Sequence, residues 1–213
     1  MERYVFSTDK EEMEEIFGVI PGSKSILNPT YNAAPGNSLP ILYKIDGRTV
    51  LENSIWGMDE LGSAIDIDEL LENKKYRDLL VTNACLVPIN GFYIWKKTVS
   101  DPLPFYTRIH TRKLLGIAGI YSEHEGQRNT FTVITKAANV LIKPVTNTMP
   151  CIIDPDDFQI WFDGQAASIL TEGFNDVNLL PEVTVVRVPD LVNDLANNSP
   201  DLIQPIPKLR EED

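Results

Sequence analysis

The sequence predicts an α+β fold in which short helices flank a mainly antiparallel, barrel-like β-sheet. Most apolar runs in the 213 residues are short and strand-like, and turn-forming residues separate them. Consecutive strands with short connections favour antiparallel pairing and closure into a barrel. No repeat and no low-complexity linker marks a boundary, so we expect one domain over residues 1–213, with a disordered acidic tail at about 206–213.

The first elements are a helix, a loop and a hairpin. Thr8 to Glu11 has the spacing of a capping box, and apolar residues at helical spacing follow it up to Gly18, which ends the helix. Proline and asparagine are frequent between positions 21 and 40, which favours an ordered loop over a strand at 31–36. Asp46-Gly47 then predicts the turn of a hairpin with strands at 41–45 and 49–56.

The rest of the chain alternates helices with short strands. Asp66 or Asp68 is expected to cap a helix running to about Leu80. A second helix should open at Asp154-Pro155 and end at Gly164, followed by one or two helical turns at 166–171. The predicted strands are 84–88, 91–96, 104–110, 114–121, 130–136, 149–153 and 183–188.

Composition narrows the protein class. The formal net charge of −12 argues against a protein that coats nucleic acid, although residues 74–143 hold 11 basic and 4 acidic residues. This local excess leaves a basic binding face and ordinary surface lysines equally open.

No apolar run reaches the roughly 18 residues that span a bilayer, so we expect a cytoplasmic protein without a membrane contact. Cys85 and Cys151 lie inside apolar runs, as buried reduced thiols do.

The residues alone show no catalytic constellation. His110 and His124 have no partner at metal-ligand or triad spacing, and surface histidines are the favoured interpretation. Glycine-rich phosphate loops, nucleophile elbows and metal clusters are absent from the sequence. We therefore expect no cofactor and no metal site.

Several segments, spread in order over nearly the whole chain, nevertheless resemble the SRAP family of SOS response-associated peptidases and abasic-site processing proteins. Residues 31–35 (YNAAP) resemble the family's Tyr-Asn-x-Ala-Pro, and 85–95 (CLVPINGFYIW) resemble Cys-Leu-Val-Pro followed by Gly-Phe-Tyr-Glu-Trp. Residues 118–121 (AGIY) and 135–150 (TKAANVLIKPVTNTMP) are similar to two further family segments, the second of which leads to His-x-Arg-Met-Pro. The resemblance implies the SRAP fold.

The resemblance also implies a chemistry that this sequence does not support. In the family, a cysteine after the initiator methionine closes a thiazolidine ring on the aldehyde of an abasic site in single-stranded DNA. A glutamate and a histidine move protons in that reaction. The matching positions here are Glu2, Ile94 and Thr146. Thr148 replaces a neighbouring arginine, and acidic Asp66 lies where the family has a phosphate-holding Asn-x-Arg segment.

These replacements predict a retained scaffold without its catalytic residues. In an alternating strand Ile94 shares a face with Phe92, while Tyr93 and Trp95 share the other face. An isolated buried carboxylate at position 94 would be costly, and isoleucine removes that cost. Glu2, Ile94 and Thr146 should still converge on one groove, bordered by positive surface from residues 74–143. Glu2 should also keep the initiator methionine in place, because its removal needs a small second residue.

Three functions remain open from the sequence. The first is a catalytically degenerate SRAP-fold module that binds single-stranded DNA by phosphate contacts and base stacking, through Arg3, Asn32, Trp56 and Arg77. The second is an active enzyme in which the α-amine of Met1 forms a Schiff base with the abasic aldehyde. The third is an acidic module that binds a protein partner and no DNA.

Overall fold

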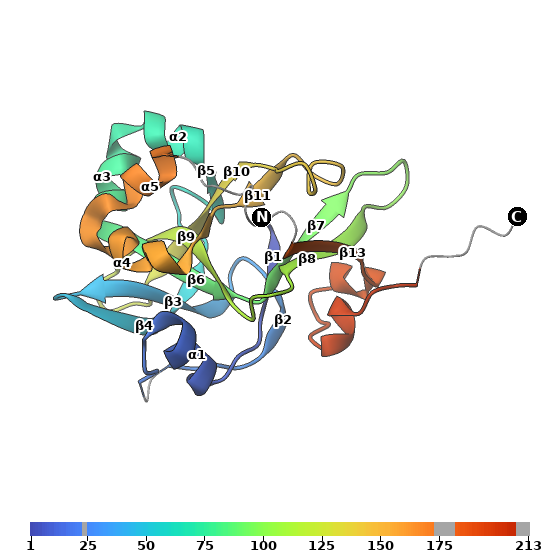
Figure 1. The fold of residues 1–213 in the computed structure, drawn as a ribbon, viewed down its shortest axis with the longest axis horizontal. Helices are drawn as coiled ribbons and strands as arrows, with labels where there is room; N and C mark the ends of the chain where they lie inside the picture. The colour runs from blue at the N-terminus through green and yellow to red at the C-terminus, as the bar shows by residue number, and fades with distance from the viewer. Residues whose placement is uncertain (23–24, 173–181, 208–213) are drawn as a thin grey trace, which may run out of the picture.

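The computed structural model describes residues 1–22, 25–172 and 182–207. Its centre is a closed ring of five strands (Figure 1). The ring runs β4–β3–β6–β9–β10 and closes because β10 pairs with both β9 and β4. The strand bounds are β3 Ser38–Ile45, β4 Arg48–Trp56, β6 Ala84–Ile89, β9 Leu115–Ser122 and β10 Thr130–Ala137. The expected barrel is thereby confirmed.

Three short strands extend the barrel sheet around β10 and β9. β5 (Ala64–Asp66) and β11 (Thr148–Pro150) pair with β10, and β12 (Ile152–Ile153) pairs with β9. β10 runs parallel to β4 and to β5, whereas the other ladders among the described strands are antiparallel. The sheet is therefore mainly antiparallel, as expected, with one parallel closure.

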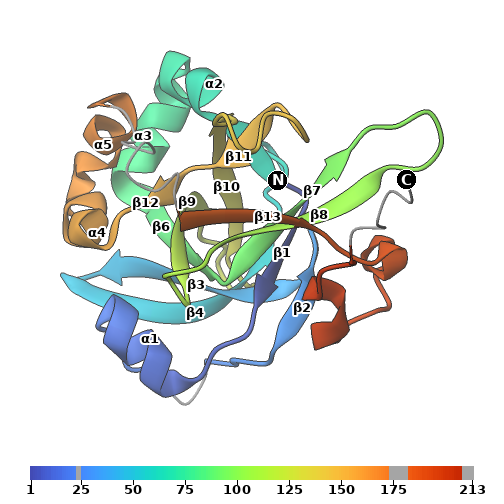
Figure 2. The same ribbon diagram turned by 45° about the vertical axis from the view of Figure 1, so that its right-hand side comes forward.

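A second sheet leans against the barrel and carries the N-terminus. Its order is β13–β8–β7–β1–β2, and Figure 2 shows β13 lying beside β8. The bounds are β1 Arg3–Phe6, β2 Thr30–Ala33, β7 Gly91–Lys96, β8 Leu103–Ile109 and β13 Val183–Arg187. Its inner face packs into the main core through residues such as Tyr4, Phe6 and Phe92. Its outer face packs a smaller cluster that includes Val5, Tyr93, Tyr106 and Leu202.

The C-terminal segment covers the middle of that outer face. Two 3₁₀ turns, η5 (Asp190–Asn193) and η6 (Pro200–Ile203), contribute Val192 and Leu202 to the outer cluster. Both views place these turns beside the second sheet and away from the helices (Figures 1 and 2). Residues 208–213 of the expected acidic tail lie outside the described residues.

Helices gather mainly on the opposite side of the barrel (Figure 1). They are α2 Ile67–Glu72, α3 Lys74–Asn83, a 3₁₀ turn η1 Pro155–Asp157, α4 Phe158–Ile160, a π-turn η2 Trp161–Gln165, and α5 Ala166–Glu172. α1 (Lys10–Phe17) lies apart from them and ends at Gly18, whose φ of 65° is the left-handed conformation of a helix C-cap. None of the helices in residues 1–22, 25–172 and 182–207 is long and apolar enough to cross a membrane.

Four local predictions are corrected by the structure. Residues 30–33 form β2 instead of a loop, because the edge of β1 supplies hydrogen-bond partners that local propensity does not reveal. Asp9, one residue after Thr8, caps α1. Asn73 breaks the predicted helix after 66 in two and caps the second half. Cys151 divides the predicted strand at 149–153. The helix that opens at Asp154-Pro155 does end at Gly164 as predicted, because Asp163 and Gly164 (φ 80°) leave the helical conformation before α5 begins.

Candidate functional site

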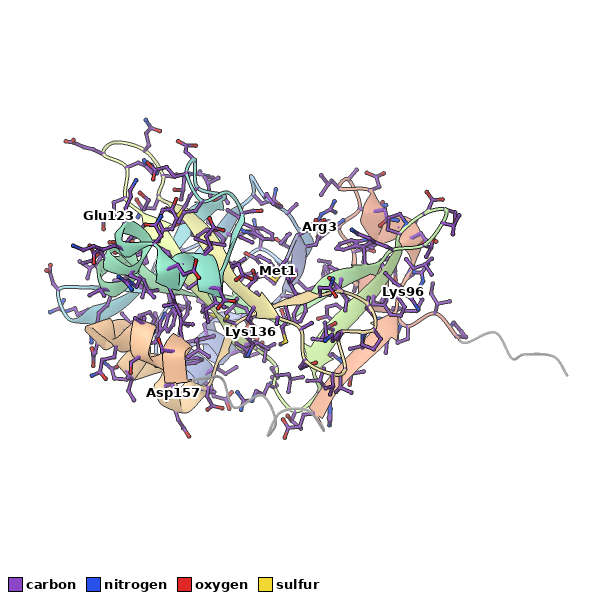
Figure 3. The ribbon with its side chains drawn as sticks, turned by 90° about the horizontal axis from the view of Figure 1, so that it is seen from above. Met1, Arg3, Lys96, Glu123, Lys136 and Asp157 are labelled. Carbon is purple, nitrogen blue, oxygen red and sulfur yellow. The ribbon has the colours of Figure 1, made fainter. Side chains whose placement is uncertain are left out.

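A groove of about 620 Å³ lies where the N-terminus passes between the two sheets. Glu2, Ile94 and Thr146 all line it, although 144 positions separate the first from the last. Glu2 directly precedes β1, Ile94 lies on β7, and Thr146 lies in the loop before β11. In the view from above, Met1 lies between the barrel and the second sheet, close to this junction (Figure 3). The expected convergence is confirmed.

Ile94 forms an apolar part of the groove wall. Strand alternation sends Phe92 and Ile94 into the main core, while Tyr93 and Trp95 belong to the outer cluster. The Ile94 side chain is only 6% exposed, so it contributes to packing as well as to the wall. It offers no hydrogen-bond donor, acceptor or titratable group to a molecule in the groove.

An aromatic ring and a guanidinium group lie together in the same groove. The half-buried Trp95 donates from its indole Nε1 to Asn193 Oδ1 at 2.8 Å, which fixes the ring. The Arg3 guanidinium carbon lies 5.9 Å from the Trp95 ring centroid, within the range of a cation–π contact. Arg3 also donates to Asn32 Oδ1 at 2.9 Å and to the Val192 carbonyl at 3.1 Å. Both groups are therefore pre-positioned.

The charges in the groove are mixed. Lys97 is exposed and basic, whereas Glu2 and Asp101 place two exposed carboxylates on the same surface. Of the basic segment 74–143, Lys97 supplies the one basic group in the described lining. Burial lowers the pKa of the Met1 α-amine below its usual range, and the charge of Glu2 partly opposes this effect. The amine therefore has more of its neutral, nucleophilic form than a free terminus.

Three of the four residues predicted to bind DNA do not line the groove. Asn32 is 4% exposed, and its amide donates to the backbone carbonyls of the C-terminal segment, so it has a structural role. Trp56 is 1% exposed and donates to the Ser63 carbonyl, so the prediction that a base stacks on it is wrong for this structure. Arg77 is exposed on α3 and is not part of the groove lining. Arg3 is the predicted contact that the structure places in the groove.

Trp95 is the groove residue that the prediction missed. Its place two positions after Tyr93 was visible in the sequence, and strand alternation put it on the outer face. The sequence does not reveal that Trp56 is buried while Trp95 is partly exposed. Both outcomes depend on which strands pair around each ring, and a single sequence does not give that pairing.

The cysteines and histidines lie outside the groove. Cys85 and Cys151 are buried and unbridged, as expected, and burial raises the pKa of the Cys85 thiol. His110 contacts the Glu182 carbonyl and His124 contacts the Thr130 hydroxyl. In the described part of the chain, no three His, Cys, Asp or Glu side chains are grouped as a metal site would need.

Comparison with protein families decides the family. The model described as SOS response associated peptidase (SRAP) matches residues 2–195. The chain belongs to the SRAP family. Among its relatives, the abasic site processing protein YoqW of Bacillus subtilis is 25% identical and aligns over 83% of this chain and 86% of its own length. The abasic site processing protein HMCES of Xenopus tropicalis is 22% identical, over 87% of this chain and 68% of its own.

Solved structures show the same fold for this SRAP chain. A protein from Bacteroides thetaiotaomicron gives a TM-score of 0.70 at 18% identity, covering 95% of this chain and 99% of its own. A phage-related protein from Bordetella bronchiseptica gives a TM-score of 0.70 at 21% identity, covering 88% and 94%. The SRAP scaffold is thus present over nearly the whole chain.

Proposed function

We propose that this SRAP-family chain binds single-stranded DNA without the covalent chemistry that the resemblance implies for the family. The observation that carries the proposal is Ile94, an aliphatic side chain packed into the wall of the groove that Glu2 and Thr146 also line. Ring closure on an aldehyde needs a nucleophile with a general acid and base beside it. Ile94 cannot move a proton at all.

The two other replacements support the same conclusion. Position 2 holds an exposed glutamate. It offers no thiol that could close a five-membered ring together with an α-amine. The Thr146 hydroxyl does not titrate near neutral pH, whereas the histidine expected at this position does. The thiol at position 2, the carboxylate at position 94 and the imidazole at position 146 that the resemblance implies are thus all missing from the groove.

Binding without covalent chemistry remains possible in this groove. The fixed Trp95 ring offers a stacking surface for a base, and Lys97 and Arg3 offer positive charge to phosphates. The names of the relatives, abasic site processing proteins, support DNA with abasic sites as the ligand. Glu2 and Asp101 oppose phosphate, so the affinity should be modest and should fall as salt rises.

A crosslinking gel with an abasic oligonucleotide tests the proposal. The protein is mixed with single-stranded DNA carrying one abasic site and is run on a denaturing gel, with and without borohydride. We expect no covalent band without borohydride, and anisotropy should show salt-sensitive binding that weakens in Trp95→Ala. A borohydride-independent band would contradict the loss of chemistry. Undetectable binding at low salt would contradict the DNA-binding part and would favour a protein partner.

The Met1 α-amine supports a second candidate function, a slow and reversible Schiff base with the abasic aldehyde. The amine lines the groove, and burial lowers its pKa. Amine attack would form a carbinolamine, and loss of water would give an imine that borohydride reduces to a stable bond. A band that appears only with borohydride would support this candidate, provided that intact mass shows a free amine on Met1. Acetylation of that amine should then abolish the band.

A further inference from the structure

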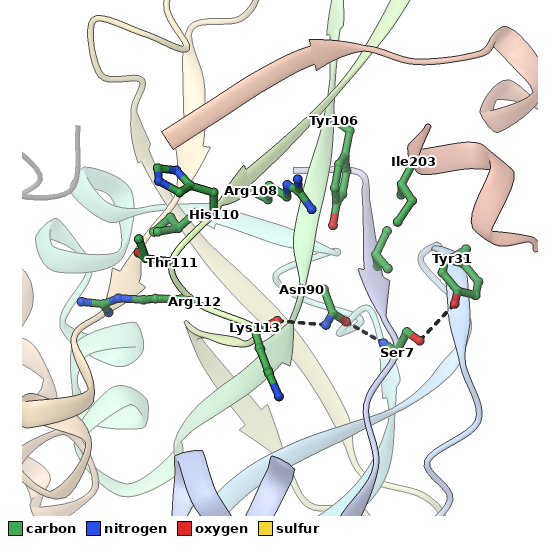
Figure 4. Close-up of a pocket in the computed structure, with 12 residues that line it drawn as sticks. Ser7, Tyr31, Asn90, Tyr106, Arg108, His110, Thr111, Arg112, Lys113 and Ile203 are labelled. Carbon is green, nitrogen blue, oxygen red and sulfur yellow. Dashed lines mark hydrogen bonds between the residues drawn. The ribbon is translucent and has the colours of Figure 1, made fainter. Parts of the chain in front are cut away.

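A second hollow, of about 330 Å³, lies at the far end of β1 from the groove (Figure 4). Val5 on β1 and Tyr106 and Arg108 on β8 line it from the outer side of the sheet. Ser7 and His110, which directly follow these two strands, line it as well. The turn η6 closes one side with Ile203. The hollow and the groove share no lining residue.

The basic side chains around this hollow differ in what they contact. Arg112 pairs with Asp154 at 3.1 Å, and Lys113 pairs with Glu12 at 3.0 Å. Arg108 has no carboxylate partner among the residues that the structure describes. Figure 4 shows its guanidinium group directed toward Tyr106, while the Arg112 side chain points away. Arg108 is therefore the cation left available to a ligand.

Tyr106 adds a hydroxyl group without a protein partner. The residue is 3% exposed, and in the described part of the chain its hydroxyl makes no hydrogen bond. It lines the hollow over Gly91, where an added Cβ would lie 2.5 Å from the Tyr106 hydroxyl oxygen. Burial raises the pKa of Tyr106 and the charge of Arg108 partly opposes this, so the hydroxyl stays protonated as a donor. The hydroxyl oxygen does not belong to the fully buried polar atoms without a partner, so it is open to the hollow, where water or a ligand can accept its proton.

Two further hydroxyls supply another donor. Ser7 Oγ and Tyr31 Oη lie 3.2 Å apart, and their hydrogen bond uses one of the two protons. The other O–H remains free to donate. Asn90 fixes this corner, because its side chain accepts from the Ser7 amide at 2.6 Å and donates to the Lys113 carbonyl at 2.9 Å. None of the described lining residues is acidic.

We propose that this hollow, defined by Arg108, Tyr106 and the Ser7–Tyr31 hydroxyl pair, is a phosphate-binding pocket separate from the groove. The guanidinium fork and at least two O–H donors come from β8, from β2 and from the residue after β1, so they can surround a tetrahedral anion, whereas a planar carboxylate would use fewer of them. The phosphate can belong to a free mononucleotide or to a nucleic-acid strand. The site would account for part of the basic excess in residues 74–143 that the groove does not use.

Titration followed by amide NMR spectra tests the pocket. Inorganic phosphate is added at constant ionic strength, with chloride and acetate as comparison anions. We expect saturable shifts of the Gly91 and Arg108 amides with phosphate alone, and a loss of affinity of at least about fivefold in R108Q and in Y106F, as expected for losing a charge-assisted hydrogen bond. The matched control R128Q removes an exposed arginine outside the pocket and should bind as the parent does.

The outcomes separate the sources of phosphate and the possible failures. Binding of thymidine 5′-monophosphate but not of an oligonucleotide without a 5′-phosphate assigns the pocket to terminal phosphates, and binding of both assigns it to the strand. Non-saturable shifts, equal binding of acetate, or unchanged affinity in a folded Y106F would overturn the proposal. Loss of DNA binding in Trp95→Ala tests the groove alone, so the two proposals can fail separately.

Discussion

Replacing Ile94 by glutamate tests whether this position is a core position that also faces the groove. The Ile94 side chain is 6% exposed and packs with Phe92 in the main core. Burying such a side chain is worth about 1.5–3 kcal/mol. Ile94→Gln should therefore destabilise the protein by about 2 kcal/mol and lower the midpoint of urea unfolding by about 1 M.

Ile94→Glu should lose more than the glutamine variant, and the difference should depend on pH. Burial raises the pKa of a carboxyl group above its value of about 4.3 in the unfolded chain. The additional loss is then fully present above the raised pKa and disappears as the pH falls below about 4.3, because the carboxyl is neutral in both states there. The urea midpoints of the two variants should differ at pH 8 and converge near pH 4.

The same variant tests the chemistry of the groove. A carboxylate without a nucleophilic thiol and without a histidine should give no borohydride-independent band with abasic DNA. If Ile94→Glu is as stable as the parent at pH 8, position 94 is not packed as described. If it forms the band, the absence of a thiol at position 2 and of a histidine at position 146 does not prevent the chemistry, and the reasoning fails.

Four further results are expected. Glu2→Gln combined with Asp101→Asn should tighten binding to a thymidine oligonucleotide by roughly two- to fivefold in anisotropy, because two groove carboxylates no longer repel phosphate; weaker binding would contradict this. Asn32→Ala should cost about 1–3 kcal/mol in urea unfolding and expose residues 190–203 to proteolysis, because the Asn32 amide no longer donates to three carbonyls of that segment. Gly91→Ala should lower the thermal midpoint through a cost of about 1–3 kcal/mol, since its Cβ would lie 2.5 Å from the Thr107 carbonyl. Cys85 should react with a disulfide reagent only after unfolding, because it is fully buried and its pKa is raised; rapid reaction of the folded protein would contradict its burial.

The sequence predicted the sheet better than it predicted exposure. The hairpin at Asp46-Gly47 and the alternation in 91–96 are local patterns, and the structure confirms both. Whether Trp56 or Trp95 is exposed depends on which strands cover each ring. That pairing joins residues far apart in the chain, as in β10 with β4, and leaves no local signal.

The candidate site was predictable where a family pattern supplied long-range information. The resemblance placed Glu2, Ile94 and Thr146 together, and the groove confirms that placement. The second hollow had a weaker signal, the basic excess in residues 74–143. Counting charges could not show that, among the described residues, Arg108 is free of a carboxylate partner and Arg112 is not. Arg112 is paired with Asp154, which lies 42 positions away in the sequence.

The C-terminal segment determines how the two sites relate. They lie at opposite ends of β1, and a strand of DNA along the outer sheet face would join them if that face were open. It is not open, because Val5, Tyr93 and Tyr106 pack there in one cluster with Val192 and Leu202. Asn32 fixes this cover by binding three carbonyls of the segment. A ligand that reaches both sites must therefore pass around the cover, so the groove and the phosphate pocket should bind independently unless the segment detaches.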